Sequence, residues 1–486
     1  MIRKAVRFLD SRSGTAPLIR KALRYVFPDH WSFLLGEIAM YAFVVLVATG
    51  TYLALFFHPS EHPVVYQGSY APLKGQVMSE AYQSVVHISF DVKAGLLIRQ
   101  THHWAANVFL AAILLHLLRV FFTGAFRKPR DVVYYVGLSM FAIALLEGFL
   151  GYSLVDDLLS GMGLAIAYSV VMAIPFVGAN LAMLIWGGPF PGAPAFWPRM
   201  YLAHVFLFPI LIALLLGLHL ALIVARHHTQ FRRTPRQTER TVVGTPMFPG
   251  YAPRSLGLAA AVASVLVLLG GLVQINPVWL WGPFHVAQAT NGAQPDWYLA
   301  WLIGALRLMP GFDVTIGHYT IAGNPFWGGV AFPLTVFLIL FLWPSLERRV
   351  TGDHAFHNLL QRPRDNPWRT AIGAALLTWV FVAFVAGAAD RYFVFFGFGL
   401  SYTSQIWVYR VLVWVLPIVV GAVTHRVCRE LLENEVVEHE RHSEEHAAET
   451  ERPDELRRRQ IEHAVARLEA REERAAPVAG PPADER

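Results

Sequence analysis

Residues 98–120, IRQTHHWAANVFLAAILLHLLRV, form an apolar stretch with three histidines, and this stretch decides the fold. The fourteen residues from His102 to His116 correspond to about 1400° of α-helical rotation and a rise of about 21 Å. This rotation is within about 40° of a whole number of turns, so the two side chains share one face of the helix. His103 is about 220° out of phase with His116, and we expect it to form a hydrogen bond near the helix end instead.

A second apolar stretch, residues 200–225, carries His204 and His219 fifteen residues apart. This interval is about 60° past a whole number of turns and rises about 22 Å, which again allows one face. An ionisable side chain in a membrane span is costly without a partner, so it indicates a functional site. Two helices with inward histidines at matched heights predict two bis-histidine sites stacked across the membrane. Neutral imidazole in an axial position suits haem iron.

Glycines repeat the same spacing in two further apolar stretches. Gly36 and Gly50 are fourteen residues apart, and so are Gly137 and Gly151. A missing side chain at both heights makes room for a flat macrocycle, which favours haem over a bare metal ion. Histidines and glycines in membrane spans can also serve helix packing alone, but the matched intervals of four histidines and four glycines disfavour that alternative.

Two arginines flank the first histidine pair. Arg99 precedes His102 by three residues and Arg119 follows His116 by three residues. Their cations are therefore placed where haem propionates would lie.

The composition is that of a membrane protein with a charged tail. Of the 486 residues 55% are hydrophobic and 15% are charged, and residues 426–486 hold 28 of the 74 charges. Runs of about 20 apolar residues cross a hydrocarbon core of about 30 Å as helices. Eight such runs occur, at 33–57, 94–122, 132–154, 200–225, 255–275, 326–346, 370–390 and 404–424. We predict an all-α integral membrane protein with eight transmembrane helices, the first four of which form a dihaem four-helix bundle.

The loops predict the orientation. Lys and Arg gather before the first run and in the loops after the second, fourth and sixth runs, so these loops and both termini are expected on the cytoplasmic side of the cell membrane. The opposite loops, 58–93, 155–199 and 276–325, can pack as short surface helices. The predicted parts are a cytoplasmic amphipathic N-terminus (1–32), the dihaem bundle (33–228), a cytoplasmic linker (229–254), the C-terminal helices (255–425) and a charged, helix-prone cytoplasmic tail (426–486).

The single cysteine, Cys428, excludes a disulfide within the chain, a CxxC site and a thiolate-held iron–sulfur cluster. Basic residues lie between apolar stretches rather than on a surface interleaved with aromatic residues, so nucleic-acid binding is not expected. A redox cofactor must therefore use other ligands.

Beyond these patterns, the chain to about residue 425 resembles the cytochrome b subunit of cytochrome bc-type quinol-oxidising complexes, most closely the actinobacterial type. The matching segments are IRQTHHW (98–104), LLHLLRVFFTGAFRKPRD (114–131), GYSLVDDLLSGMG (151–163), AIPFVG (173–178), PRMYLAHVFLFP (198–209) and PDWY (295–298). The resemblance implies two non-covalent b haems. His102 and His204 would hold the low-potential haem near the outer face, and His116 and His219 the high-potential haem near the cytoplasm.

The resemblance also implies a quinol pocket at the outer face, within the loop that contains PDWY. Asp296 stands where relatives usually have Glu, and it keeps a carboxylate that can take a proton from quinol. This change makes low-potential menaquinol the expected substrate. Tyr298 would help to fix the quinol. The implied lining residues are Pro295, Trp297, Ile174, Pro175 and Phe176.

The roles of two membrane-associated residues remain open. His228 is a candidate for an inner quinone site, and it can equally be a solvated interfacial residue. Glu147 can be a proton relay or a hydrogen-bonded helix residue.

The resemblance implies a quinol:cytochrome c oxidoreductase subunit that passes electrons to an inner quinone site and builds a proton-motive force. Its expected partners are a Rieske-type iron–sulfur subunit, a cytochrome c subunit of dihaem type, a second copy in a homodimeric complex and a terminal cytochrome oxidase. Two alternatives remain open: a dihaem membrane anchor of a dehydrogenase or hydrogenase, and a haem-free transporter with histidines in its substrate path.

Overall fold

The computed structural model describes residues 12, 14, 23–288, 295–390 and 401–475. The chain divides into two compact units, Met1–His425 and Arg426–Arg486. Most of the predicted N-terminal part (1–32) and the last residues of the predicted tail lie outside the described residues.

Eight helical segments of the described chain are long and apolar enough to cross a membrane, which confirms the predicted number. They are Trp31–Ala54, Gly95–Phe122, Asp131–Ser153, Phe196–Arg226, Met247–Leu272, Asn324–Thr351, Pro367–Gly387 and Tyr402–Ser443.

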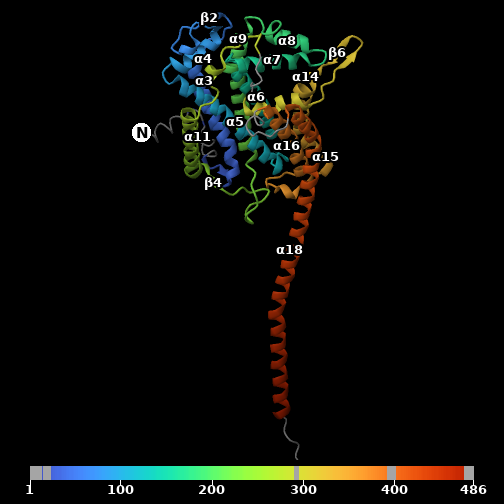
Figure 1. Cartoon of the computed structure of the whole chain (residues 1–486). Helices are drawn as coiled ribbons and strands as arrows, with labels where there is room; N and C mark the ends of the chain where they lie inside the picture. The colour runs from blue at the N-terminus through green and yellow to red at the C-terminus, as the bar shows by residue number, and fades with distance from the viewer. Residues whose placement is uncertain (1–11, 13, 15–22, 289–294, 391–400, 476–486) are drawn as a thin grey trace, which may run out of the picture. The chain divides into compact units, whose positions relative to one another are not determined.

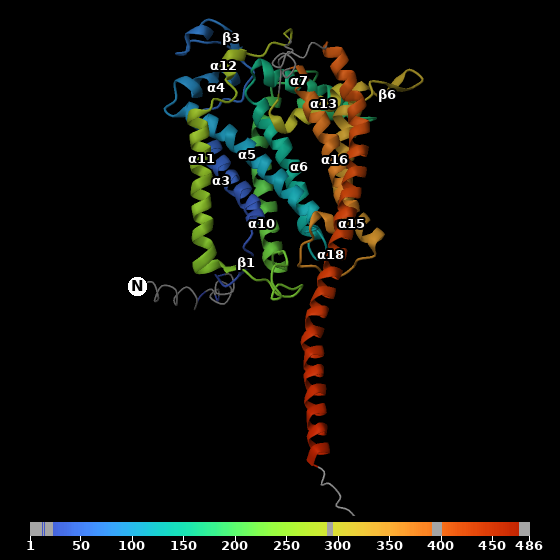
Figure 2. The same ribbon diagram turned by 60° about the horizontal axis from the view of Figure 1, so that its bottom comes forward.

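The first four spans form the bundle that carries the histidines (Figures 1 and 2). They comprise α3 (Leu34–Ala54), α5 (Gly95–Phe122), α6 (Asp131–Ser153) and a continuous segment made of α9 (Phe196–Leu202), η3 (Ala203–Leu207) and α10 (Phe208–Arg226). Helix α3 packs along α5, and α6 packs along α10, while α11 (Ala252–Leu272) packs against both α3 and α5. The shared core includes Phe43, Phe109, Leu110 and Ile212. The bundle thus consists of two helix pairs.

The later helices form a second core. They are α13 (Trp297–Leu308), α14 (Asn324–Phe326), η5 (Trp327–Ala331), α15 (Phe332–Thr351), α16 (Pro367–Gly387) and the beginning of α18 (Tyr402–Ala475). Helices α13 and α16 cross closely, because a Cβ atom on Gly304 would lie only 1.6 Å from the carbonyl oxygen of Ala383. At the start of α13, Tyr298 and Leu299 belong to the core of the histidine bundle, so this helix joins the two cores.

Short elements gather at one end of the bundle, as the loops predict. They are β2 (Pro63–Val65), η2 (Ala71–Leu73), β3 (Val77–Ser79), α4 (Glu80–Phe90), α7 (Leu158–Met172), α8 (Gly178–Trp186), α12 (Val278–Trp281), β5 (Val314–Ile316) and β6 (Tyr319–Ala322). Strands β2 and β3 pair antiparallel, as do β5 and β6. Side chains cap two of the helices: Ser79 accepts from the Tyr82 N–H, and Asp157 accepts from the Ser160 N–H.

At the other end, β1 (Val26–Phe27) pairs antiparallel with β4 (Thr245–Pro246). The N-terminal segment is therefore joined to the segment predicted as a linker. The remaining short helices of the described chain are η1 (Trp31–Phe33), η4 (Met247–Tyr251) and η6 (Pro363–Asp365).

The second unit is the charged part of α18, and it confirms that the residues after Arg426 are helical as far as Ala475. Ion pairs at i,i+4 spacing, Arg426–Glu430 and Arg429–Glu433, lie on its surface. Such exposed pairs contribute little to helix stability, because water and salt screen them.

Candidate functional site

The four membrane histidines lie in two pairs between α5 and the α9–η3–α10 segment. At the first, which we call the His102 level, the ring centroids of His102 and His204 are 6.3 Å apart. At the second, the His116 level, the centroids of His116 and His219 are 6.5 Å apart. An imidazole nitrogen binds a first-row metal at about 2.0–2.1 Å, so two rings that share one metal ion have centres roughly 6 Å apart. Each pair therefore has the spacing that two imidazole rings would need to hold one iron atom between them.

The turn that carries His204 explains the unequal intervals in the two helices. Residues Ala203–Leu207 form a π-helical turn. Such a turn holds one extra residue, so the fifteen residues from His204 to His219 cover the rotation of about fourteen in a regular α-helix. The rotation from His204 to His219 then equals the rotation from His102 to His116, about 1400°.

The four predicted glycines each face one histidine ring: Gly50 faces His102, Gly151 faces His204, Gly36 faces His116 and Gly137 faces His219. A Cβ atom on Gly151 would lie 2.6 Å from Cε1 of His204, and one on Gly50 would lie 3.1 Å from Cε1 of His102. The corresponding distance is 3.3 Å at both Gly36 and Gly137. Larger residues would push the rings toward the cofactor space, so the glycines form the cradle expected for a flat group between paired imidazoles.

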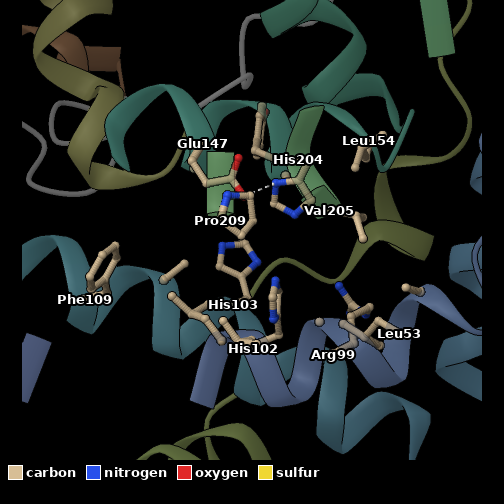
Figure 3. A pocket seen from close by; sticks show the side chains of 18 of the residues that line it. Leu53, Arg99, His102, His103, Phe109, Glu147, Leu154, His204, Val205 and Pro209 are labelled. Atoms are coloured by element: carbon tan, nitrogen blue, oxygen red, sulfur yellow. Dashed lines mark ion pairs between the residues drawn. The ribbon is translucent and has the colours of Figure 1, made fainter. Parts of the chain in front are cut away.

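A cavity of about 250 Å³ opens at the His102 level (Figure 3). Its walls come from α3, α5, α6 and the η3–α10 segment, and they include both histidines and both glycines of this level. Asp296 and Tyr298 also line it. The predicted haem space thus adjoins the loop that was predicted to bind quinol.

The guanidinium groups of the two predicted arginines lack several hydrogen-bond partners. Arg99 is 8% exposed and lines the cavity, and its guanidinium donates to the Asn276 carbonyl oxygen at 3.3 Å. Within the described residues, Nε of Arg99 and both Nε and Nη2 of Arg119 have no hydrogen-bond partner. Buried guanidinium N–H groups without a hydrogen-bond partner are costly, and propionate carboxylates would accept from these groups on both arginines.

The Nδ1 atoms of the histidines have different surroundings. Nδ1 of His102 lies 2.9 Å from the hydroxyl of Thr49, which donates to the Val45 carbonyl oxygen at 2.7 Å. The hydroxyl therefore accepts from Nδ1–H, and Nε2 of His102 is left free for a metal. Sequence reasoning missed Thr49, although its place directly before Gly50 was a usable signal.

Nδ1 of His204 lies 2.9 Å from Oε1 of Glu147, and the two side chains point toward one another (Figure 3). Glu147 is therefore paired with a predicted iron ligand. Among the described residues, Nδ1 of His204, of His116 and of His219 all lack a partner with hydrogen-bond geometry, so His204 is distinguished by the nearby carboxylate alone.

Asp296 is held by two side chains. Its Oδ1 is 2.7 Å from Nε2 of His103, and its Oδ2 accepts from the Tyr298 hydroxyl at 3.0 Å. The first contact confirms the predicted hydrogen-bonding role of His103 and identifies its partner, which is 193 residues away. Burial by itself raises the pKa of the Asp296 carboxyl. The charge and hydrogen bond of His103 and the hydrogen bond of Tyr298 outweigh burial, so the pKa lies below its ordinary value.

The other predicted quinol-pocket residues do not line this cavity. Ile174, Pro175 and Phe176 lie between α7 and α8, where the Phe176 side chain is 83% exposed. Pro295 and Trp297 flank Asp296 but do not line the cavity either. Their role in binding quinol stays a prediction.

His228 lies at the opposite end, beneath the N-terminal segment. Its Nδ1 is 2.9 Å from the Tyr25 hydroxyl, and its ring packs near Phe27 and Phe33. Burial, helped by the charges of Arg119 and Arg130, lowers the pKa of His228 to about 3. His228 is thus a packed, neutral side chain rather than a solvated one.

Paired imidazoles inside a membrane-spanning bundle define a haem-type electron-transfer membrane protein. Residues 107–283 match the family described as cytochrome b(N-terminal)/b6/petB. The cytochrome bc1 complex cytochrome b subunit of Mycobacterium leprae is 47% identical over 86% of this chain and 75% of its own length. The subunits of Streptomyces coelicolor (86% and 76% covered) and Corynebacterium diphtheriae (89% and 79% covered) are 44% and 43% identical.

The chain belongs to this family of cytochrome b subunits. A solved hyperthermophilic respiratory Complex III shares the fold, with a TM-score of 0.63 and 18% identity over 86% of this chain and 99% of that one. Family membership favours the predicted haem and quinone chemistry over the membrane-anchor and transporter alternatives.

Proposed function

We propose that this chain is the membrane-spanning subunit of a quinol:cytochrome c oxidoreductase and holds two non-covalent b haems, one at each histidine level. The observation that carries the proposal is the repeated arrangement of paired rings, 6.3 Å and 6.5 Å between centroids, with a glycine against every ring. When bound, the haems supply one-electron chemistry at two heights of the bundle.

The protein's part in this arrangement is to hold and orient. His102 and His204 would hold one haem through their imidazole nitrogens, and His116 and His219 would hold the other. Thr49 keeps the His102 ring in the tautomer that leaves Nε2 unprotonated.

At the His102 level, Asp296 accepts a proton from menaquinol as it is oxidised. The carboxylate is ionised in the neutral pH range because His103 and Tyr298 lower its pKa, and the same two contacts hold it in one orientation. Tyr298 helps to fix the quinol, and the lining by Pro295, Trp297, Ile174, Pro175 and Phe176 belongs to the same proposal. His228 is proposed for the inner quinone site.

The basic loops support a cell-membrane location with both termini in the cytoplasm and the His102 level near the outer face. Protons released at Asp296 then leave outside, while quinone reduction takes up protons inside, which builds a proton-motive force.

The chain has a single cysteine, which is too few to hold an iron–sulfur cluster or to attach c-type haems. These groups must therefore belong to other chains of the complex. We propose a Rieske-type iron–sulfur subunit and a dihaem cytochrome c subunit as partners, in a homodimeric complex that associates with a terminal cytochrome oxidase.

The test is a reduced-minus-oxidised spectrum with a haem assay on the purified complex, followed by quinol-dependent reduction of a cytochrome c acceptor. We expect two b haems per chain and turnover that a quinol-pocket ligand stops. A single b haem, or none, contradicts the two-site proposal. Two haems without any quinol-dependent turnover would contradict the quinol-oxidising role.

A further inference from the structure

The two histidines of the His102 level differ in the chemistry of their Nδ1 partners. His102 meets the neutral hydroxyl of Thr49, and His204 meets the carboxylate of Glu147, both at 2.9 Å. The His204 and Glu147 side chains are 18% and 15% exposed, so water screens this contact little.

Glu147 is a carboxylate inside a membrane span, which is costly without a partner. Its second oxygen, Oε2, is buried and has no hydrogen-bond partner within residues 23–288, 295–390 and 401–475. Beside it, the Tyr298 hydroxyl packs against Gly148, where a Cβ atom would lie 2.8 Å from it. The pairing with His204 is therefore the contact that offsets the burial of Glu147.

We infer that Glu147 is a positioning residue that holds His204 with its proton on Nδ1 and lowers the reduction potential of the haem at the His102 level. The inference rests on the proposed binding of two haems. It gives a physical reason for two potentials in a bundle whose two sites share the same ligands.

The direction of the effect follows from charge. With Glu147 ionised, its negative charge close to the axial ligand favours the oxidised, more positive state of the iron over the reduced state. A carboxylate close to Nδ1–H also makes Nε2 a stronger donor to the iron, which acts in the same direction. Both effects lower the potential.

The other charged groups near this level do not cancel the effect. Asp296 lies at the same cavity, but its charge is paired with His103 at 2.7 Å. Arg99 lines the cavity of the His102 level, and the charge of Asp157 acts on it, so this cation does not offset the carboxylate of Glu147. The carboxylate on an axial histidine is found at one level alone among the described residues.

The test is a redox titration of both b haems, at one pH, in the complex with Glu147→Gln, Glu147→Asp or Thr49→Val. We expect Glu147→Gln to keep both haems and to raise the potential at the His102 level. The equilibrium between the two haems should shift at least tenfold, or about 59 mV for one electron. Glu147→Asp keeps the charge and should shift this equilibrium less than threefold. Thr49→Val, the matched change on the other ligand of the same haem, should also shift it less than threefold.

An unchanged reduction potential in haem-loaded Glu147→Gln would overturn the inference. A fall in turnover at an unchanged potential would also contradict it, since Glu147 would then act on proton transfer. If Glu147→Gln failed to hold the haem, Glu147→Asp would decide. A tenfold shift in that charged variant would contradict the inference, and a potential close to that of the parent would support it. A parent complex without two haems would instead refute the proposed function.

Discussion

The His102 and His116 levels have the same arrangement of histidines and glycines and differ in the residues around it. Each has two imidazoles from the same two helical segments, with centroids 6.3 Å and 6.5 Å apart, and two facing glycines. The His102 level also gathers Glu147, His103, Asp296 and Tyr298 around its cavity. The repeated cofactor cradle thus becomes two different sites through side chains that other helices and loops contribute.

The largest expected effect is loss of haem from one level only, caused by tighter packing of a glycine against its histidine ring. Gly151→Ala places a Cβ atom 2.6 Å from Cε1 of His204, whereas the matched change at the other level, Gly137→Ala, leaves 3.3 Å to His219. We expect Gly151→Ala to lose the haem at the His102 level, because a ring fixed by iron and Glu147 cannot retreat. Gly137→Ala should keep both haems. Haem content per chain measures this, and equal loss in the two variants would show that the levels are equally tight.

The next effect tests the chemistry assigned to the His102 level. Asp296→Asn keeps the size of the side chain but removes the basic oxygen, and a positioned general base contributes about 10²–10⁴-fold. We expect turnover with a menaquinol analogue to fall at least tenfold with both haems present, while Asp296→Glu keeps much of the activity. Asp91→Asn, at the end of α4, serves as the control. Turnover within about twofold of the parent in Asp296→Asn would mean that another group takes the proton.

The smallest effect concerns the buried acids in the loops beyond the His102 level. Burial raises the pKa of Asp156 to about 7, and the neighbouring Glu61 and Asp157 raise it further against the hydrogen bond from Ser79. A carboxyl whose pKa is higher in the folded state stabilises the fold at low pH. This contribution is lost as the pH rises from the ordinary Asp range, about 4, through about 7.

Asp156→Asn carries no ionisable group and can keep the contact with Ser79. We therefore expect its Tm to exceed that of the parent complex by about 2–4 °C at pH 8, and the difference to shrink toward pH 5. Thermal unfolding at the two pH values measures this. A larger advantage at pH 5 than at pH 8 would refute the sign.

Much of the fold and of the cofactor site was predictable because it depends on local periodicity. Eight apolar runs predicted eight spans, and histidine and glycine intervals predicted which side chains meet at each level. The His204 interval looked imperfect because a π-helical turn leaves no signal in hydropathy. The prediction that Ile174, Pro175 and Phe176 line the quinol pocket rested on resemblance alone. No local sequence pattern indicates which cavity a loop residue lines.

By itself, the sequence determined the spans, the two histidine levels and the glycine cradle, since a regular helix converts spacing directly into direction and height. Only the tertiary structure decided that His103 meets Asp296 and that Glu147 meets His204. These contacts join segments whose separation along the chain carries no information about distance in space. They form because α13 and α6 pack against the histidine helices, so the difference between the two sites arises in the packing rather than in the repeat.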